Sequence, residues 1–371
     1  MGGEREGRDP PAVFIGNPAA EMIEILLNPD PAAWRGYCGR HHAALFTHLR
    51  GWSSALAAAY DLPVFFLLAR AAAAPGDTAG ILPLLLFSPP GGTRRLISLP
   101  YTDAAGIVAD SDAVRRRLLA AALELAAATG AAHLELRQYG RFEIVPPLSA
   151  LTDWQCTAHS FKIGLDRLLP ATTAELWDDL PAKVRNQVRK AWRCGCVVRI
   201  GGGELVDDVH GVFSDNMRDL GSPTHGVELF RQVIGQDDLR ARCIVVYHRG
   251  VPAAGAMVFE HGGTLFNPWA SSLRRLRPIC ANMLLYWTML AHGIRQGCRR
   301  FDFGRSSPGT STSRFKMQWG AGARPLYWYV FSRNGHEWYP SNESLVSEDW
   351  KRMDLADSRR EGPAIRRWIS L

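Results

Sequence analysis

The same order of predicted elements occurs twice along the chain, and this repeat constrains the fold more than any other feature. Each half is predicted to contain three strands, then a helix, then a fourth strand. The ranges are 62–70, 80–88, 94–99, 112–129 and 133–137 in the first half, and 242–248, 254–260, 264–271, 278–296 and 300–304 in the second. A glycine follows each helix, Gly130 or Gly297. The repeat predicts two tandem domains of the same fold.

A helix between the third and fourth strands allows the fourth strand to run parallel to a neighbour, whereas short turns join antiparallel strands. We therefore predict an α/β fold in which each domain is a mixed, mostly antiparallel sheet flanked by helices. The predicted boundaries are a flexible N-terminal lead-in at 1–35, an N-terminal domain at 36–165, a C-terminal domain with the active site at 166–335 and a C-terminal surface tail at 336–371.

The composition is that of a folded protein. The 371 residues are 47% hydrophobic, which is enough for two packed cores. No run of 18 apolar residues occurs, so no transmembrane helix is predicted, although association with a membrane surface stays open. The N-terminus MGGEREGRDPP lacks the apolar region of a secretion signal, which predicts a cytoplasmic protein. The sequence indicates no particular oligomeric state.

Charge and cysteine spacing narrow the classes of partner. The formal net charge of +7 favours anionic partners such as phosphates, coenzyme A, RNA or acidic glycans. The seven cysteines include no C-x-x-C pair, and Cys194-Gly195-Cys196 alone cannot supply the four ligands of a zinc site. We therefore predict no bound metal.

Two basic segments are candidates for phosphate binding. Arg185 and Arg189 stack at i, i+4 spacing on a predicted helix, where like charges repel unless an anion binds between them. The alternative is a solvated face that is balanced by acids such as Asp178. Arg277 precedes Pro278 at the start of the 278–296 helix, where free backbone N–H groups favour a pyrophosphate.

The segment 301–319 predicts a strand, a loop and a short helix. Asp302, Arg305 and Lys316 lie at the strand end and on that helix, where open α/β sheets bind substrates. Asp302 could accept a proton from an attacking amine, and Lys316 could stabilise the developing oxyanion. The alternative is a structural ion-pair network that contains all three residues.

A polar turn at 216–225 supplies further candidates for substrate contact. These are Asn216, Arg218 and His225. The alternative is that the segment serves only to end a helix at Gly221.

Several segments resemble the FemAB-like branch of the GNAT acetyltransferase superfamily, and more narrowly the FemAB-related proteins associated with exosortase (PEP-CTERM) and exopolysaccharide loci. The resembling segments are GILPL from Gly80, LISLPYTDAAGIVAD from Leu96, LELR from Leu134, VRNQVRKAWRCG from Val184, NMRDLGSP from Asn216, FDFGRSSPGTSTSRFKMQWGA from Phe301 and WKRMDLA from Trp350. They span about positions 40 to 371, and the segment from Phe301 is the most specific.

The resemblance implies two tandem GNAT-like (acyl-CoA N-acyltransferase) domains. It implies transfer of an acyl or aminoacyl group to an amine of a cell-envelope, peptidoglycan or exopolysaccharide precursor, that is, to a small-molecule or lipid-linked glycan or peptide acceptor. A lysine in an FK-containing segment of Fem-type peptidyltransferases, which use aminoacyl-tRNA, matches Lys316. The resemblance thus implies acyl-CoA or aminoacyl-tRNA as the donor, with tRNA as a possible partner.

The sequence departs from both kinds of donor-binding enzyme in one respect each, and two other functions stay open. Acetyl-CoA-dependent enzymes have a glycine-rich loop where this chain has Ile279-Cys280-Ala281-Asn282, which argues against classical CoA binding. No long helical-hairpin insertion of the kind that holds tRNA is evident, which argues against a tRNA donor. The alternatives to envelope acyl transfer are an ordinary acetyl-CoA-dependent N-acetyltransferase and a non-catalytic RNA-binding or scaffold protein.

Overall fold

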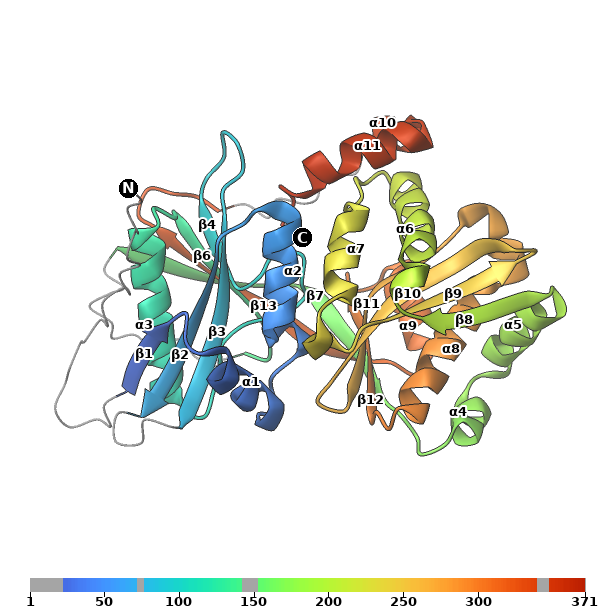
Figure 1. The fold of residues 1–371 in the computed structure, drawn as a ribbon, viewed down its shortest axis with the longest axis horizontal. Coiled ribbons are helices and arrows are strands. Elements are labelled where there is room, and N and C mark those ends of the chain that lie inside the picture. The colour runs from blue at the N-terminus through green and yellow to red at the C-terminus, as the bar shows by residue number, and fades with distance from the viewer. Residues whose placement is uncertain (1–22, 72–76, 142–152, 339–346, 371) are drawn as a thin grey trace, which may run out of the picture.

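The computed structural model describes residues 23–71, 77–141, 153–338 and 347–370. Within these residues, thirteen strands form one continuous sheet (Figure 1). The strands are β1 Ile23–Leu27, β2 Val64–Ala71, β3 Thr78–Phe87, β4 Arg95–Ile97, β5 Val108–Ala109, β6 His133–Tyr139, β7 Trp154–Leu168, β8 Cys196–Gly201, β9 Arg242–His248, β10 Val251–His261, β11 Thr264–Ser272, β12 Arg300–Ser306 and β13 Gly322–Arg333.

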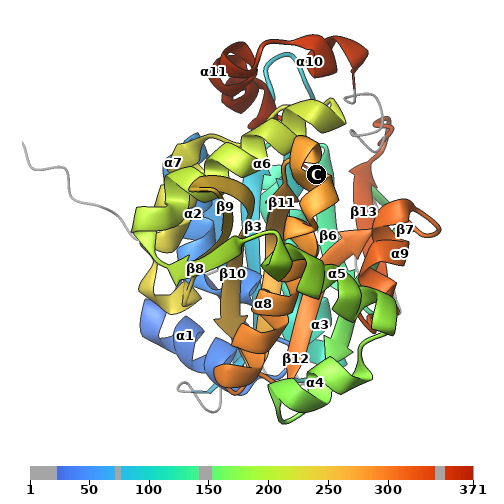
Figure 2. The ribbon, with the colours of Figure 1, turned by 90° about the vertical axis from the view of Figure 1, so that its right-hand side faces the viewer.

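Helices cover both faces of this sheet (Figure 2). The α-helices are α1 Pro31–Arg40, α2 Arg50–Tyr60, α3 Asp112–Ala128, α4 Thr173–Asp179, α5 Ala182–Arg193, α6 Val206–Leu220, α7 Val227–Ile234, α8 Ala281–Arg295, α9 Ser311–Met317, α10 Glu348–Arg352 and α11 Leu355–Arg366. Short 3-10 helices are η1 Phe46–His48, η3 Gly203–Leu205, η4 Asp237–Leu239 and η5 Arg274–Ile279.

The repeated order of elements that the sequence predicts is confirmed. In the first half β2, β3 and β4 pair antiparallel, and α3 leads to β6, which runs parallel to β4. In the second half β9, β10 and β11 pair antiparallel, and α8 leads to β12, which runs parallel to β11. Each half therefore has the predicted mixed strand pairing, with its parallel step made across a helix, but the two halves share one sheet.

The two halves are joined by an exchange of strands at the centre of the sheet. The strand order is β1-β2-β3-β4-β6-β13-β7-β12-β11-β10-β9-β8. β13, which comes last in the chain, lies between β6 of the first half and β7. β7 spans the predicted boundary at residue 165 and pairs on its other side with β12. Backbone hydrogen bonds therefore run without interruption from one half to the other.

Three large apolar clusters follow from the two faces of the sheet. One face is covered by α1, α2, α6 and α7, whose buried side chains form a single cluster that includes residues of both halves, such as Trp52 and Trp269. On the opposite face, α3 packs on the first half and α8 with α5 on the second. α8 is apolar on most of its circumference, because the sheet lies on one side and α5 on the other.

Both ends of the described chain contribute to the fold. Residues 23–35 form β1 and the first half of α1, so the expectation of a flexible lead-in is wrong for this stretch, and residues 1–22 lie outside the described range. In the predicted surface tail, Ser370 is 1% exposed and its carbonyl accepts hydrogen bonds from Arg137 and from the backbone of Tyr101. None of the helices in the described ranges has the length and apolar character needed to cross a membrane.

Candidate active site

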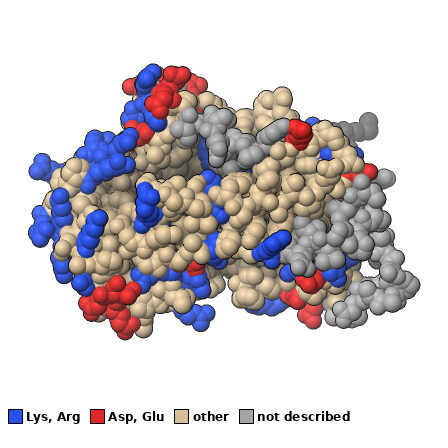
Figure 3. Space-filling view, turned by 180° about the vertical axis from the view of Figure 1, so that it is seen from behind, with Lys and Arg blue, Asp and Glu red and all other residues tan. Residues whose placement is uncertain are grey.

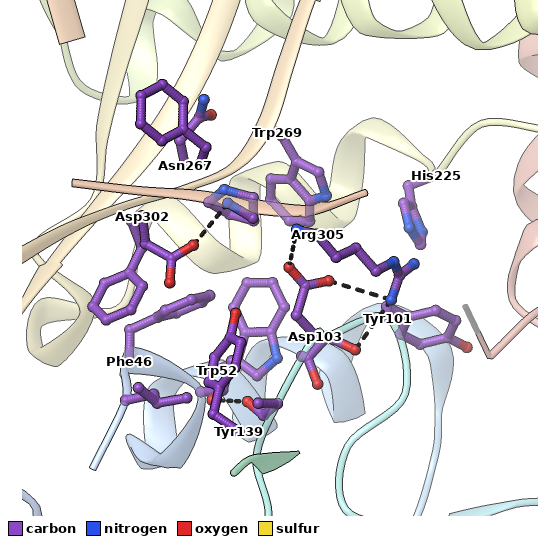
Figure 4. Close-up of a pocket in the computed structure, with 18 of the residues that line it drawn as sticks. Phe46, Trp52, Tyr101, Asp103, Tyr139, His225, Asn267, Trp269, Asp302 and Arg305 are labelled. Carbon is purple, nitrogen blue, oxygen red and sulfur yellow. Dashed lines mark hydrogen bonds and ion pairs between the residues drawn. The ribbon is translucent and has the colours of Figure 1, made fainter. Parts of the chain in front are cut away.

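A cavity lies where two neighbouring parallel strands separate. β11 and β12 pair over only three residues, from Thr264 opposite Arg300 to Phe266 opposite Asp302. Beyond this point their backbones diverge and leave a cavity of ≈ 270 Å³ (Figure 4). The residues that line it are Phe266–Trp269, Asp302–Arg305, Lys316, Phe213, Met217, His225 and Arg366 together with Leu45, Phe46, Thr47, Trp52, Tyr101–Ala104 and Tyr139. Both halves of the chain therefore form its walls.

Gly304 shapes the strand at this point. The pairing of β12 with β7 shifts register between Asp302 and Arg305, and Gly304 has φ +70°, a conformation that side-chain-bearing residues avoid. A Cβ atom at Gly304 would lie 3.2 Å from Asp103 Oδ2 and 4.0 Å from Lys316 Nζ. The glycine thus permits the close approach of the charged groups around it.

Asp302 is a buried carboxylate with two fixed hydrogen bonds. Its side chain is on the cavity wall, and the residue is 3% exposed. Oδ1 accepts from Gly304 N at 2.7 Å, and Oδ2 accepts from Arg324 Nη2 at 2.7 Å. Burial raises the pKa of Asp302 to about 6, and Arg324 limits the rise. A carboxyl group that titrates near neutral pH is suited to general base catalysis.

Lys316 is a buried cation on α9. The residue is 6% exposed, and Nζ donates to the carbonyl oxygen of Arg305 at 2.7 Å. Thr310 caps the helix by accepting from Ser313 N, which fixes the helix start. Burial lowers the pKa of Lys316 to about 8. At neutral pH the ammonium therefore remains charged and can face a developing oxyanion.

The first half of the chain contributes a carboxylate that sequence reasoning missed. Asp103 accepts from the backbone N–H of Arg305 at 2.8 Å and pairs with Arg305 Nη1 at 3.2 Å. Asp103 follows a turn in which Leu99 and Tyr101 have positive φ. The segment from Leu96 belongs to the FemAB-like resemblance, but nothing in its spacing indicates that it meets β12.

Arg324 links the cavity to an ion-pair network. Its Nη2 pairs with Asp302 at 2.7 Å, its Nε lies 3.5 Å from Asp166, and its guanidinium lies 3.5 Å from the ring centroid of Tyr139. Arg300 also pairs with Asp166. Asp302 therefore lines the cavity and also belongs to an ion-pair network. Its predicted catalytic role and the alternative of a structural ion pair are thus compatible.

His225 lines the cavity as a neutral imidazole. The residue is 2% exposed, Nε2 accepts from Arg366 Nε at 3.2 Å, and Nδ1 contacts the Tyr60 hydroxyl. Burial, with a smaller effect of Arg366, holds the pKa of His225 well below its usual range. Since Nε2 is an acceptor, the ring proton lies on Nδ1.

Two buried side chains of the cavity have polar atoms with no hydrogen-bond partner among the described residues. They are Trp52 Nε1 and both polar atoms of the Asn267 amide, although the Tyr286 hydroxyl lies near Asn267. A buried polar group without a partner is costly. A bound substrate could therefore be stabilised by these groups.

The structure brings Asp302, Arg305, Lys316 and His225 together, but places the other predicted site residues away from the cavity lining. Asn216 donates to Ser271 Oγ at 3.2 Å, and Arg218 pairs with Asp219. Arg277 is exposed on η5, Arg189 is exposed on α5, and Arg185 donates to the carbonyl oxygen of Trp177.

Lys and Arg side chains spread over the half of the surface that carries α5 and β8 (Figure 3). Among the described residues no cluster of His, Cys, Asp and Glu suited to a metal is found.

Comparison with known proteins shows which domain family and which solved structures this chain is similar to. Residues 181–317 match the family model of the acetyltransferase (GNAT) domain. The fold is similar to the crystal structure of FemX, with a TM-score of 0.64, 14% identity, and coverage of 82% of this chain and 96% of that one. It is also similar to a tandem GNAT protein from the clavulanic acid biosynthesis pathway (TM-score 0.52, 15% identity, coverage 85% and 99%).

A third similar structure is the C-terminal domain of a candidate lysylphosphatidylglycerol synthetase from Agrobacterium fabrum. Its TM-score is 0.51 at 13% identity, with coverage of 76% of this chain and 87% of that one. No curated protein matches the sequence at a significant level. The matched domain is of the acetyltransferase (GNAT) type, and the fold is that of tandem GNAT-like units. Residues 181–317 therefore carry a GNAT-type domain, and the fold of the chain as a whole is FemX-like.

Proposed function

We propose that this protein transfers an acyl or aminoacyl group to an amine of a cell-envelope, peptidoglycan or exopolysaccharide precursor. The observation that carries the proposal is the cavity at the divergence of β11 and β12, which has Asp302 and Lys316 on its walls. Burial brings the pKa values of both groups toward neutrality, as acid–base catalysis requires.

The two side chains have complementary roles in the proposed reaction. The amine nitrogen attacks the carbonyl carbon of the donor, and Asp302 accepts the amine proton as the new C–N bond forms. The ammonium of Lys316 stabilises the negative charge that develops on the carbonyl oxygen. When the bond to the donor's sulfur or oxygen breaks, Lys316, with a pKa of about 8, can give the leaving group its proton.

Different observations favour each of the two donors. The GNAT domain match supports an acyl-CoA. Cys280 has φ +61° directly before α8, so the chain makes a tight turn where the exposed Arg277 and the helix N-terminus could receive a pyrophosphate. The FemX-like fold and the basic surface around α5 support an aminoacyl-tRNA, for which Arg185 and Arg189 would contact phosphates.

The acceptor and the location of the reaction rest on the sequence resemblance. A link to PEP-CTERM or exopolysaccharide loci is proposed from the segments quoted above. We also propose a cytoplasmic site of action, with a small-molecule or lipid-linked glycan or peptide as acceptor, because activated precursors of envelope polymers carry phosphate groups that suit a basic protein.

The donor can be identified by thermal unfolding with acetyl-CoA, a long-chain acyl-CoA or an aminoacyl-tRNA. A ligand at about 100 times its dissociation constant adds roughly 2.7 kcal/mol of stability. A rise in Tm with one CoA ester identifies that donor, whereas a rise with charged but not uncharged tRNA identifies aminoacyl transfer. If none of the three stabilises the protein, transfer from these donors is wrong and an RNA-binding or scaffold role gains support.

A further inference from the structure

A second cavity adjoins the first on the other side of a shared wall. Its volume is ≈ 490 Å³, and Leu45, Ala104 and Tyr139 line both cavities. It lies between the segment 41–48, the segment 104–109, α3 and the first residues of β12 and β13. Tyr139, which lines both cavities, is labelled below Asp302 in Figure 4.

The charged side chains that line the second cavity are all basic. Among the described residues, the lining contains four arginines and three histidines and no aspartate or glutamate. The arginines are Arg115, Arg141, Arg300 and Arg324. The acidic partners of Arg115 and Arg300, which are Asp112 and Asp166, are not among the lining residues. A guanidinium has five N–H donors, so an arginine that is paired with a carboxylate can also bind a second anion.

Arg324 connects this cavity to the proposed general base. Its guanidinium lies over the Tyr139 ring that separates the cavities and reaches Asp302 in the first. It also shares Asp166 with Arg300. An anion in the second cavity would compete with Asp302 and Asp166 for these two arginines, because arginine forks bind phosphate and carboxylate in the same geometry.

We propose that the second cavity is a binding site for a phosphate or carboxylate group of the acceptor, held by Arg300, Arg324 and Arg115. Its assignment to the acceptor rests on the proposed function, whereas the anion site itself does not. Binding of this group would draw Arg324 away from Asp302 and make the carboxylate a stronger base when the acceptor is in place. The site thus couples recognition of an anionic acceptor to the catalytic carboxylate.

The anion site is tested first without any transfer reaction. Inorganic phosphate and acetate are titrated into the full chain at constant ionic strength, with heat of binding as readout. We expect saturable binding of at least one anion, weakened about tenfold in Arg300→Gln and in Arg115→Gln. Arg115 is half-buried on α3, away from the ion pairs of the central sheet, so its variant tests the site even if loss of Arg300 disturbs folding. Arg299→Gln, an exposed neighbour that does not line the cavity, is the matched control and should bind as wild type.

The following results would overturn the proposal or part of it. Absence of saturable binding, or equal weakening in Arg299→Gln, rejects the site. If phosphate binds but raises the KM of the donor instead of the KM of the acceptor, the assignment to the acceptor is wrong. If phosphate competes with the acceptor but not with the donor, the assignment of the site to the acceptor is supported. If no transfer is detected with any donor, the proposed function fails, while the titration still decides whether the site exists.

Discussion

Arg324 Nη2 donates to Asp302 Oδ2 over 2.7 Å, so the last strand of the sheet to appear in the chain holds the carboxylate at the cavity. Arg324 is on β13, which lies between β6 and β7, whereas Asp302 is on β12 on the far side of β7. The exchange of strands between the halves therefore places the counter-ion of the proposed base. It also ties the charge state of the site to the integrity of the central sheet.

Removal of this counter-ion should shift the pH dependence of transfer. Arg324 lowers the pKa of Asp302 against the larger effect of burial, so Arg324→Gln should raise that pKa further. Since the ionised carboxylate is the active form in the proposed reaction, the acidic limb of the kcat/KM profile should move upward by about one pH unit. Arg333→Gln, at the other end of β13, is the control. An unchanged acidic limb in Arg324→Gln would exclude the ion pair from control of the base.

Lys316→Met should stabilise the protein at neutral pH while it reduces transfer. The folded-state pKa of about 8 lies below the unfolded value of 10.5, so the buried charge opposes folding below pH 8. The unfolded chain binds more protons between these values, so wild-type stability rises with pH across this window. Relative to Lys316→Met, the wild type should gain up to roughly 3 kcal/mol from pH 8 to 10.5. Urea unfolding of both proteins measures the difference, and a constant difference would contradict the burial argument.

Substitution of Gly304 should affect both stability and transfer. Gly304→Ala places a side chain at φ +70°, which costs about 1–2 kcal/mol, and its Cβ approaches Asp103 Oδ2. Gly309→Ala is the matched control, since Gly309 has φ +73° but no atom within 4 Å of the added Cβ. Both variants should lose similar stability, but only Gly304→Ala should lose transfer. Equal activity of the two variants would show that the close packing around Gly304 is not needed.

Removal of residues 369–371 should destabilise the first half of the chain. Arg137 is fully buried, and it donates to the Ser370 carbonyl at 2.7 Å and to Ser370 Oγ at 3.1 Å. Loss of both acceptors leaves the guanidinium, among the described residues, with Glu135 and the Trp328 ring and should cost roughly 2–3 kcal/mol, whereas Ser370→Ala keeps the carbonyl and should cost about 1 kcal/mol. Chemical unfolding distinguishes the two, and equal costs would argue against the carbonyl contact.

The sequence predicted the repeated elements well, because periodicity and terminating glycines are local signals. The parallel steps across α3 and α8 followed from those elements. The position of β13 between β6 and β7 could not be predicted, since strand order depends on contacts between distant segments. The helix predicted to begin at Pro278 begins at Ala281, because 274–279 forms η5 and Cys280 takes a left-handed conformation.

The same contrast between local signals and distant contacts explains why only part of the candidate site was predicted. Asp302, Arg305 and Lys316 occur in one short segment, so their spacing alone brought them together. Asp103 and Arg324 come from distant parts of the chain and meet β12 only through the exchanged sheet. Charge patterns identified Arg185 and Arg189 as a basic face, but such patterns give no distance to a cavity, and their role in phosphate binding stays a prediction.

The most direct test of the central claim is the rate of acyl transfer by Asp302→Asn with the donor identified by thermal unfolding. Asparagine keeps an oxygen for the Gly304 N–H but cannot accept a proton from the amine. We predict that kcat/KM falls by about 10²–10⁴-fold while the fold and the donor-induced rise in Tm persist. Transfer at the wild-type rate by this variant would contradict the assignment of Asp302 as the general base of the reaction.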